Sequence, residues 1–199
     1  MNSYLRISLN ANAEQAARLL ALQAAFAKAC NVLAPLVRQT RCWNRVTLHH
    51  LYYKALREQF PELGSQMVCN VIYSVSRTSR HIYQHPQSPF NMARLEGKSL
   101  PLLNFADTCP VYFDRHTLSI KDGRLSMYTL DGRMRFDLEL SPQAQAGFRE
   151  QKLREIVLSR TPKQDFELSF IFSEAQAESA SAGADGGEVP EYVMVEEAA

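Results

Sequence analysis

The hydrophobic pattern of this chain changes its period at Pro110. Before Pro110 the apolar residues recur at helical spacing, and after it they alternate along short segments, as in half-buried strands. In the second part, Asp-Gly pairs at 122–123 and 131–132 separate alternating segments, which predicts two hairpin turns. The length of 199 residues fits one compact domain or two small ones. The pattern therefore predicts an α+β fold in which helices come first and a meander of strands follows.

The expected elements follow these two periods. Helices are predicted from Asn12 to about Asn31, from Thr47 to Phe60 and from Ser65 to Gln84, with Asn12, Thr47 and Ser65 as N-caps and Gln15 completing a capping box. Strands are predicted at residues 4–9, 111–113, 118–121, 124–130, 133–138, 153–160 and 166–172, with a linking segment at 141–152. The first strand thus precedes the helices and is expected to rejoin the later strands.

Four segments result from this division. Residues 1–10 hold the first strand, 11–105 a helical insertion, 106–173 the remainder of a β-barrel-like sheet, and 174–199 a tail. The tail carries seven acidic residues and no Lys or Arg, and its composition of Ala, Ser, Gly and Glu predicts disorder.

The net charge of +1 hides an uneven distribution. Between Lys28 and Lys98 there are ten Lys or Arg residues against three Asp or Glu residues, a net charge of +7. Such a block is typical of a surface that binds a polyanion, and it is also found on solvated helix faces that bind nothing. Charge by itself leaves both interpretations open.

The sequence shows no sign of a membrane or secreted protein, nor of a metal site or a disulfide framework. No apolar run approaches the ~20 residues of a membrane span and no secretory signal precedes the first strand, which predicts a cytoplasmic protein without membrane contact. The cysteines at 30, 42, 69 and 109 form no CxxC pair, so neither a metal site, a cofactor nor a disulfide framework is expected. His49 and His50 are adjacent on a helix and cannot converge on one metal ion.

One face of the third predicted helix is polar. Its members recur at spacings of three and four residues opposite the apolar stripe: Gln66, Asn70, Tyr73, Arg77, Arg80 and Gln84. Carboxamides pair with adenine edges and guanidinium groups hold phosphates, so this face is a candidate groove reader. The alternative is an ordinary solvated helix face.

Further candidates lie on other elements. Arg38, Arg41, Trp43 and Arg45 cluster on the connection between the first two helices, where an indole and guanidinium groups suit an unpaired base and its backbone, unless Trp43 is a core residue. Lys54 and Arg57 lie on the second helix, and Lys121 and Arg124, with Arg133 and Arg135, flank the Asp-Gly hairpins. These cations are candidates for contact with an RNA backbone, or ordinary surface residues.

The segment TLHHLYYKALREQFPELGSQMVCNVIYSVSRTSRHIY resembles the helical recognition region of the TnpB-like, OrfB-type transposon-encoded RNA-guided nucleases, relatives of the type V CRISPR effectors. The segments CPVYFDRHTLSIKDGRLSMYTLDGRMRFDLEL and LREIVLSRTPKQDFELSFIF resemble the wedge domain of the same family. The resemblance covers roughly residues 4–173 in order. It implies a β-barrel-like wedge domain with a helical recognition insertion after its first strand.

The resemblance also implies roles for this chain. In the family, polar residues at the start of the third helix read a short motif in duplex DNA, which implicates Gln66 and above all Asn70. The RuvC nuclease domain and the zinc ribbon that follow the wedge in that family have no counterpart here, so no catalytic residue is expected.

The sequence therefore favours a non-catalytic, nuclease-deficient module that binds a structured guide-like RNA, with duplex DNA as a second partner. Two alternatives remain. The chain is the recognition subunit of a split RNA-guided endonuclease whose RuvC domain lies on a separate chain, or it is an inactive transposase remnant of a mobile element.

Overall fold

The computed structural model describes residues 2–173 and 186–197, which fold as two compact units. The first unit combines Met1–Leu22 with Pro110–Ser181, and the second combines Gln23–Cys109 with Ala182–Ala199. Each unit is therefore built from two stretches that are far apart in the sequence. Helix α1, Ala13–Thr40, begins in the first unit and ends in the second.

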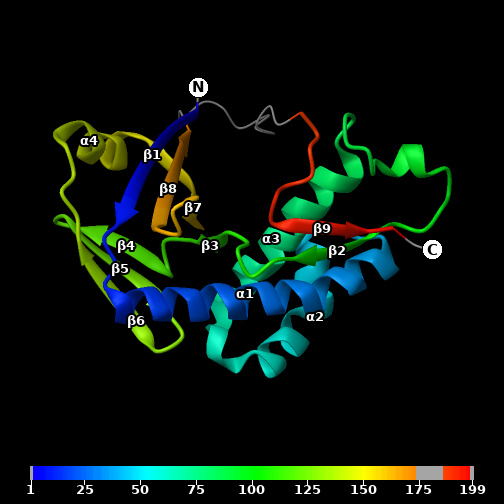
Figure 1. Ribbon diagram of the computed structural model, residues 1–199, viewed down its shortest axis with the longest axis horizontal. Coiled ribbons are helices and arrows are strands. Elements are labelled where there is room, and N and C mark those ends of the chain that lie inside the picture. Colours follow the sequence, from blue (N-terminus) through cyan, green and yellow to red (C-terminus); the bar gives the residue numbers. More distant parts are fainter. Residues whose placement is uncertain (1, 174–185, 198–199) are drawn as a thin grey trace. The chain divides into compact units, whose positions relative to one another are not determined.

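Helices and strands both contribute to the chain, so the predicted α+β class is confirmed (Figure 1). The helices after α1 are α2 (Arg45–Gln59), α3 (Gly64–Gln84) and α4 (Pro142–Glu150), with short 3-10 turns at Pro61–Leu63 and Met92–Leu95. The strands are β1 (Asn2–Leu9), β2 (Leu102–Phe105), β3 (Val111–Phe113), β4 (Leu118–Lys121), β5 (Arg124–Thr129), β6 (Gly132–Asp137), β7 (Lys152–Arg160), β8 (Phe166–Ser173) and β9 (Val193–Glu196).

The first unit contains a four-stranded antiparallel sheet in the order β1-β8-β7-β3. The first strand does rejoin the later ones, because β1 pairs with β8 along its whole length. Alternate residues of β8 are buried, and Phe148 of α4 packs its ring edge-on against Phe170 and Phe172, at centroid distances of 5.0 and 5.2 Å. The segment predicted as a linker is therefore partly a helix that covers this sheet.

A second sheet of the first unit is the hairpin series β4-β5-β6. Its first turn is the predicted one, with φ of 50° at Asp122 and 74° at Gly123, the left-handed pair that a type I′ turn requires. The second turn is displaced by one residue from the prediction. Leu130 and Asp131 form it, and Gly132 opens β6 with a φ of 104°.

The predicted β-barrel does not close among the described residues, whose strands form open antiparallel sheets. A local hydrogen-bonded turn explains why the chain leaves the first sheet after β3. The amide of Asp114 donates to Thr117 Oγ1 at 2.9 Å, and the amide of Thr117 donates to Asp114 Oδ1 at 3.0 Å. This turn reverses the chain, and β4 then pairs with β5 rather than extending the sheet that ends at β3.

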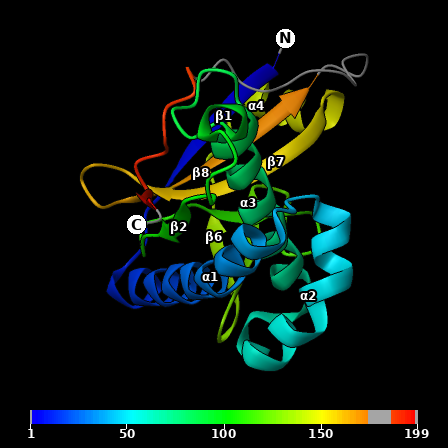
Figure 2. The same cartoon turned by 90° about the vertical axis from the view of Figure 1, so that its right-hand side faces the viewer.

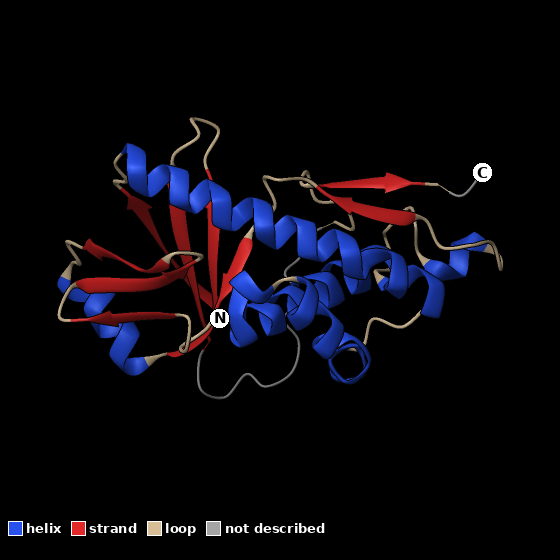
Figure 3. Ribbon diagram, turned by 90° about the horizontal axis from the view of Figure 1, so that it is seen from below, coloured by secondary structure: helices blue, strands red, loops and turns tan. Residues whose placement is uncertain are grey.

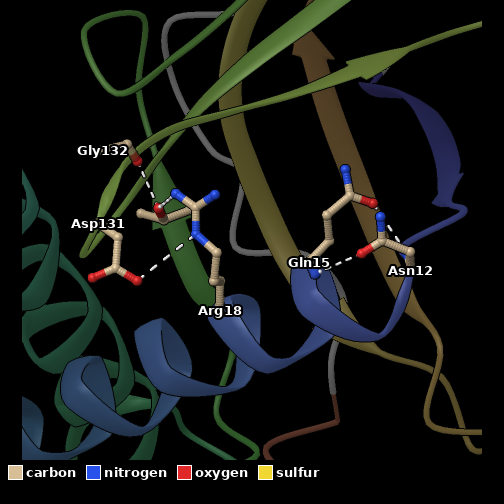
Figure 4. A network of polar contacts seen from close by, with 6 residues as sticks. Asn12, Gln15, Arg18, Asp131 and Gly132 are labelled. Atoms are coloured by element: carbon tan, nitrogen blue, oxygen red, sulfur yellow. Dashed lines mark hydrogen bonds and ion pairs between the residues drawn. The ribbon is translucent and has the colours of Figure 1, made fainter.

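The start of α1 is the capping box that the sequence predicts. The amide of Gln15 donates to Asn12 Oδ1 at 2.8 Å, and the amide of Asn12 donates to Gln15 Oε1 at 3.0 Å (Figure 4). One turn later, Arg18 donates to Thr129 Oγ1 at 2.8 Å and lies 3.8 Å from a carboxylate oxygen of Asp131 (Figure 4). These contacts join the first turns of α1 to the β5–β6 hairpin.

The other helix boundaries differ from the predicted ones. Helix α1 continues to Thr40 instead of ending near Asn31, because Leu33 and Val37 are buried and their packing outweighs the backbone hydrogen bond that Pro35 cannot make. Asn44, not Thr47, caps α2, accepting from the amides of Val46 and Thr47. Helix α3 begins at Gly64, without a side-chain cap.

The second unit is mainly helical, and residues 23–105 of the predicted helical insertion 11–105 fall within it. Helices α2 and α3 pack side by side (Figure 2), and buried residues of α1, α2 and α3 fill the core, among them Phe26, Leu33, Leu48, Leu56, Val71, Val75 and Ile82. The unit also contains a two-stranded antiparallel sheet of β2 and β9 (Figure 3).

Strand β9 lies in the segment predicted to be a disordered tail, so that prediction is wrong for residues 186–197. Residues 174–185 and 198–199 lie outside the described part of the chain. The buried Val193 pairs with Phe105, and the amide of Ala106 donates to the carbonyl of Tyr192 at 2.9 Å. The short apolar run at 192–195 is visible in the sequence of this acidic segment, but its pairing partner β2 lies far away along the chain.

Helix α1 is, within the described residues, the one helix long and apolar enough to cross a membrane by length and composition. Its most apolar window has a mean hydropathy of 1.5, and half of that window is buried inside the protein. The expectation that no apolar run approaches membrane-spanning length is therefore wrong for α1. A core helix of a soluble protein meets the same criterion, so the absence of a membrane span stays a prediction.

The docking of residues 186–197 depends on Gly187. Its φ is 72°, and a Cβ there would lie 2.6 Å from the carbonyl carbon of Gln87 and 2.7 Å from the amide nitrogen of Ser88. We expect Gly187→Ala to lower the free energy of unfolding of the second unit by ~1 to 3 kcal/mol, because backbone atoms would have to move apart. Hydrogen exchange at the amides of β9, together with thermal melts, measures the change.

Gly186→Ala is the matched control. A Cβ at Gly186 would meet nothing closer than Gln87 Oε1 at 3.8 Å, an ordinary contact. The two variants add the same methyl group at neighbouring positions. Equal exchange rates at β9 in both variants would contradict the proposed role of Gly187.

Candidate nucleic-acid interface

The polar face predicted on α3 is only partly at the surface. Arg77, Arg80 and Gln84 are exposed, whereas Gln66 and Tyr73 are half-buried. Arg80 makes no hydrogen bond or ion pair within the described residues, so its guanidinium group is available to a phosphate. The C-terminal half of α3 is thus the part of this face that presents charge to the solvent.

Asn70 is buried, with 8% of its surface exposed. Its Nδ2 lies 3.7 Å from the sulfur of Met67, one turn earlier on the same helix. In this conformation the carboxamide that the sequence favours as a base reader does not reach the surface. Gln66 is better placed for that role.

The burial of α3 extends beyond its apolar stripe because small polar residues let other elements approach closely. Ser74, Ser76, Thr78 and Ser79 are each 3% exposed or less. The hydroxyl of Ser76 donates to the carbonyl of Trp43. Helical periodicity does not distinguish such small polar residues from solvent-facing ones, and for this reason the sequence pattern predicts Asn70 at the surface.

The cluster between α1 and α2 separates into a buried and an exposed part. The indole of Trp43 is 7% exposed and packs on the ring of Tyr83 at a centroid distance of 5.4 Å, which is the core role considered for it. Arg41 and Arg45 are exposed. The guanidinium carbon of Arg45 lies 5.3 Å from the centroid of the Tyr73 ring, a cation–π contact that joins the start of α2 to α3.

Arg38 is held beside the end of α1 by one hydrogen bond, from its Nε to the carbonyl of Leu100 at 2.8 Å. The nearby Tyr83 hydroxyl donates to the carbonyl of Pro101 at 2.7 Å. Burial raises the pKa of Tyr83 well above its ordinary value, and the positive charge of Arg38 opposes that rise. The Tyr83 hydroxyl therefore remains a neutral donor at physiological pH.

The cations of α2 are less well placed. Lys54 is exposed, and Arg57 is half-buried with Nη1 shielded from solvent and without a hydrogen bond. His49 stacks on Tyr53 at a centroid distance of 4.6 Å. The exposed side of α2 therefore carries both apolar and aromatic groups beside Lys54, and it is a weaker candidate for phosphate contact than α3.

The sheet β4-β5-β6 of the first unit has one buried and one exposed face. Leu118, Leu125, Met127, Met134 and Phe136 form the buried face. Cross-strand neighbours on the exposed face form one row of Lys121, Arg124 and Asp137 and another of Ser119, Ser126 and Arg135. The structure therefore brings the predicted residues Lys121 and Arg124 onto one surface with Arg133 and Arg135.

Two arginines of this face have partners within the sheet. Arg124 Nε lies 3.2 Å from Asp137 Oδ1, in an exposed ion pair. Arg133 donates to the hydroxyl and the carbonyl of Ser126 at 2.8 and 3.0 Å. Lys121 and Arg135 make no hydrogen bond or ion pair within residues 2–173 and 186–197.

In the part of the chain that the structure describes, no three His, Cys, Asp or Glu side chains gather where they could hold a metal ion. The four cysteines are free thiols, and Cys30 and Cys109 are buried. Burial raises the pKa of the Cys30 thiol, and a hydrogen bond with Cys109 adds to the rise. The Cys30 thiol is therefore a protonated core group.

No known family model matches this chain, and a search of curated proteins found no match. The resemblance to TnpB-like nucleases therefore remains a prediction from the residues quoted above.

Asn70→Ala tests whether this residue reads bases or packs in the core. Because the side chain is buried, we expect a loss of about 1 kcal/mol in the free energy of unfolding and no change in sequence preference. Denaturant unfolding and competition binding with duplexes of varied sequence measure the two effects. Gln84→Ala, an exposed carboxamide on the same helix, is the control for stability. A changed preference with unchanged stability would establish Asn70 as a reader.

Proposed function

We propose that this chain is a nucleic-acid-binding module that holds a structured RNA, as the guide-recognition lobe of a TnpB-like nuclease does. The observation that carries the proposal is the basic exposed face of the sheet β4-β5-β6. Within the three strands this face carries four cations, Lys121, Arg124, Arg133 and Arg135, and one carboxylate, Asp137.

The shape and chemistry of this face suit a phosphate backbone. Side chains on one face of a sheet are held about 5 Å apart across the strands, so the cross-strand neighbours Lys121 and Arg124 can contact neighbouring phosphate oxygens, while Arg135 lies in the next row. The serines between them offer hydroxyl groups for ribose or phosphate oxygens. Binding through such contacts is strongly salt-dependent, because each neutralised phosphate releases counterions.

A second surface supports binding of duplex DNA. Arg80 and Arg77 are exposed on α3, and the region from Lys28 to Lys98 carries a net charge of +7. The resemblance gives the start of α3 the role of reading a short motif next to the target, and Gln66 is the candidate for it because Asn70 is buried. The exposed arginines would then anchor the phosphates on either side of that motif.

The order of elements along the chain supports a wedge-like arrangement. Strand β1 precedes the helices, and its sheet partners β8, β7 and β3 follow them. This is the order that a wedge domain with a helical recognition insertion has. In this proposal the chain binds without catalysis, and any cleavage of DNA belongs to a separate RuvC-containing chain.

The double variant Lys121→Gln/Arg135→Gln tests the sheet face. It removes two cations that have no partner in the described part of the chain, so we expect weaker binding of structured RNA with little loss of stability. The slope of log K against log salt should fall by about two units, because about two phosphate contacts are lost. RNA that co-purifies with the protein serves as the probe in filter-binding or fluorescence titrations over a salt series.

Lys152→Gln/Lys163→Gln is the matched control, with the same change in charge on exposed residues of the first unit outside this sheet. It should leave the affinity nearly unchanged. Equal effects of the two double variants would mean that only net charge matters, and the proposed face would then be wrong.

A further inference from the structure

A cavity in the second unit contains two arginines of the candidate cluster. Its volume is about 410 Å³, and its polar lining consists of Arg38, Gln39, Arg41 and Ser99. All four come from the end of α1 and from the segment before β2. No carboxylate lines the cavity in the part of the chain that the structure describes.

Arg38 is positioned in advance for a ligand. Its Nε donates to the carbonyl of Leu100, which restricts the plane of the guanidinium group. The two Nη groups make no hydrogen bond within the described residues. An anion in the cavity would therefore bind to a guanidinium group that is already ordered. Less conformational entropy of the Arg38 side chain would be lost on binding.

Arg41 joins the cavity through an unusual backbone conformation. It follows the last residue of α1 with a φ of 52°, in the left-handed region that favours glycine. The position is the one where a helix most often ends on glycine, so an arginine there costs conformational energy. That cost is consistent with a role for the side chain in binding.

The arginines also determine the sign of charge that the cavity accepts. The carbonyl groups at the end of α1 carry partial negative charge, and Glu196 of β9 stands across from Leu102 in the strand pair. Both oppose an anion. The two guanidinium groups and the exposed Lys98, next to Ser99 in sequence, outweigh them.

The rest of the lining is apolar. Pro35, Leu100 and Leu102 complete the cavity. A ring can stack on the exposed pyrrolidine of Pro35, and the carboxamide of Gln39 can pair with the edge of a base. The ligand must therefore combine an anionic group with a flat, partly apolar one.

We propose that this cavity binds one phosphorylated nucleoside, with its phosphate on Arg38 and Arg41 and its base against Pro35 and the leucines. The volume lies near the lower end of the ~300 to 1,000 Å³ typical of ligand sites, which suits one nucleotide. The inference rests on the proposed function, because the nucleotide is then an unpaired residue of the bound RNA. A free mononucleotide has the same chemistry, and the experiment separates the two sources.

Arg41→Gly is the decisive variant. It removes one guanidinium group. Glycine adopts a φ of 52° without strain, so the protein should remain folded. Calorimetric titration with AMP, CMP, GMP, UMP and inorganic phosphate, and fluorescence titration with a short single-stranded RNA and a fully paired hairpin, serve as the readouts. Lys28→Gln is the matched control, an exposed cation on the same helix that does not line the cavity.

We expect Arg41→Gly to weaken binding of the single-stranded RNA roughly tenfold, the loss typical of one charged hydrogen-bonding group. Binding of the paired hairpin should change little, and Lys28→Gln should have little effect on either RNA. Gln39→Ala should alter the preference among the four bases. Inorganic phosphate should bind more weakly than the nucleotides, because it leaves the apolar wall exposed to water.

The outcomes separate this inference from the proposed function. If RNA binds and Lys121→Gln/Arg135→Gln weakens it, but Arg41→Gly changes nothing, the cavity proposal is overturned and the RNA-binding function stands. If mononucleotides bind and no RNA does, the RNA form of the proposal is overturned and the cavity serves free nucleotides. Equal affinity for phosphate and nucleotides would overturn the role of the apolar wall.

Discussion

The burial of α1 is the interaction on which both units depend. The helix begins at the capping box of Asn12 and Gln15, and its first turns are bound to the β5–β6 hairpin through Arg18. Further along, Phe26, Leu33 and Val37 lie in the helical core of the second unit. The side chain of Asn31 exchanges two hydrogen bonds with the backbone of Phe105, at 2.7 and 2.9 Å. One helix therefore supplies core residues and polar contacts to both parts of the chain.

The positions of the candidate interfaces follow from which residues each unit buries in its core. In the first unit, one face of the sheet β4-β5-β6 is buried and the alternation of the strands places Lys121, Arg124 and Arg135 on the other. In the second unit, α3 is buried over much of its circumference, so its exposed charge concentrates at Arg77 and Arg80. The positions of these cations are thus consequences of core packing. The proposed binding role is assigned to these cations because they remain exposed after the core has formed.

The acidic segment 186–197 changes the charge distribution of the second unit. Its pairing with β2 places Glu196 beside a unit that is otherwise basic, and His81 Nε2 lies 2.9 Å from the carbonyl of Glu188. Tyr192 is hydrogen-bonded to Thr78 and lies near Arg77, and burial raises the pKa of its hydroxyl. The net charge of +7 between Lys28 and Lys98 is therefore partly offset in the folded protein.

The sequence by itself determined the class of the fold, the capping box of α1, the type I′ turn at Asp122-Gly123 and the strands β3 and β4, because each depends on local periodicity or on backbone conformation within a few residues. Only the tertiary structure decided that α1 continues past Pro35, that Asn70 and Trp43 are buried, and that β9 pairs with β2. Those features depend on partners far along the chain. Burial against distant residues outweighs local propensity, and no pattern within a single segment records it.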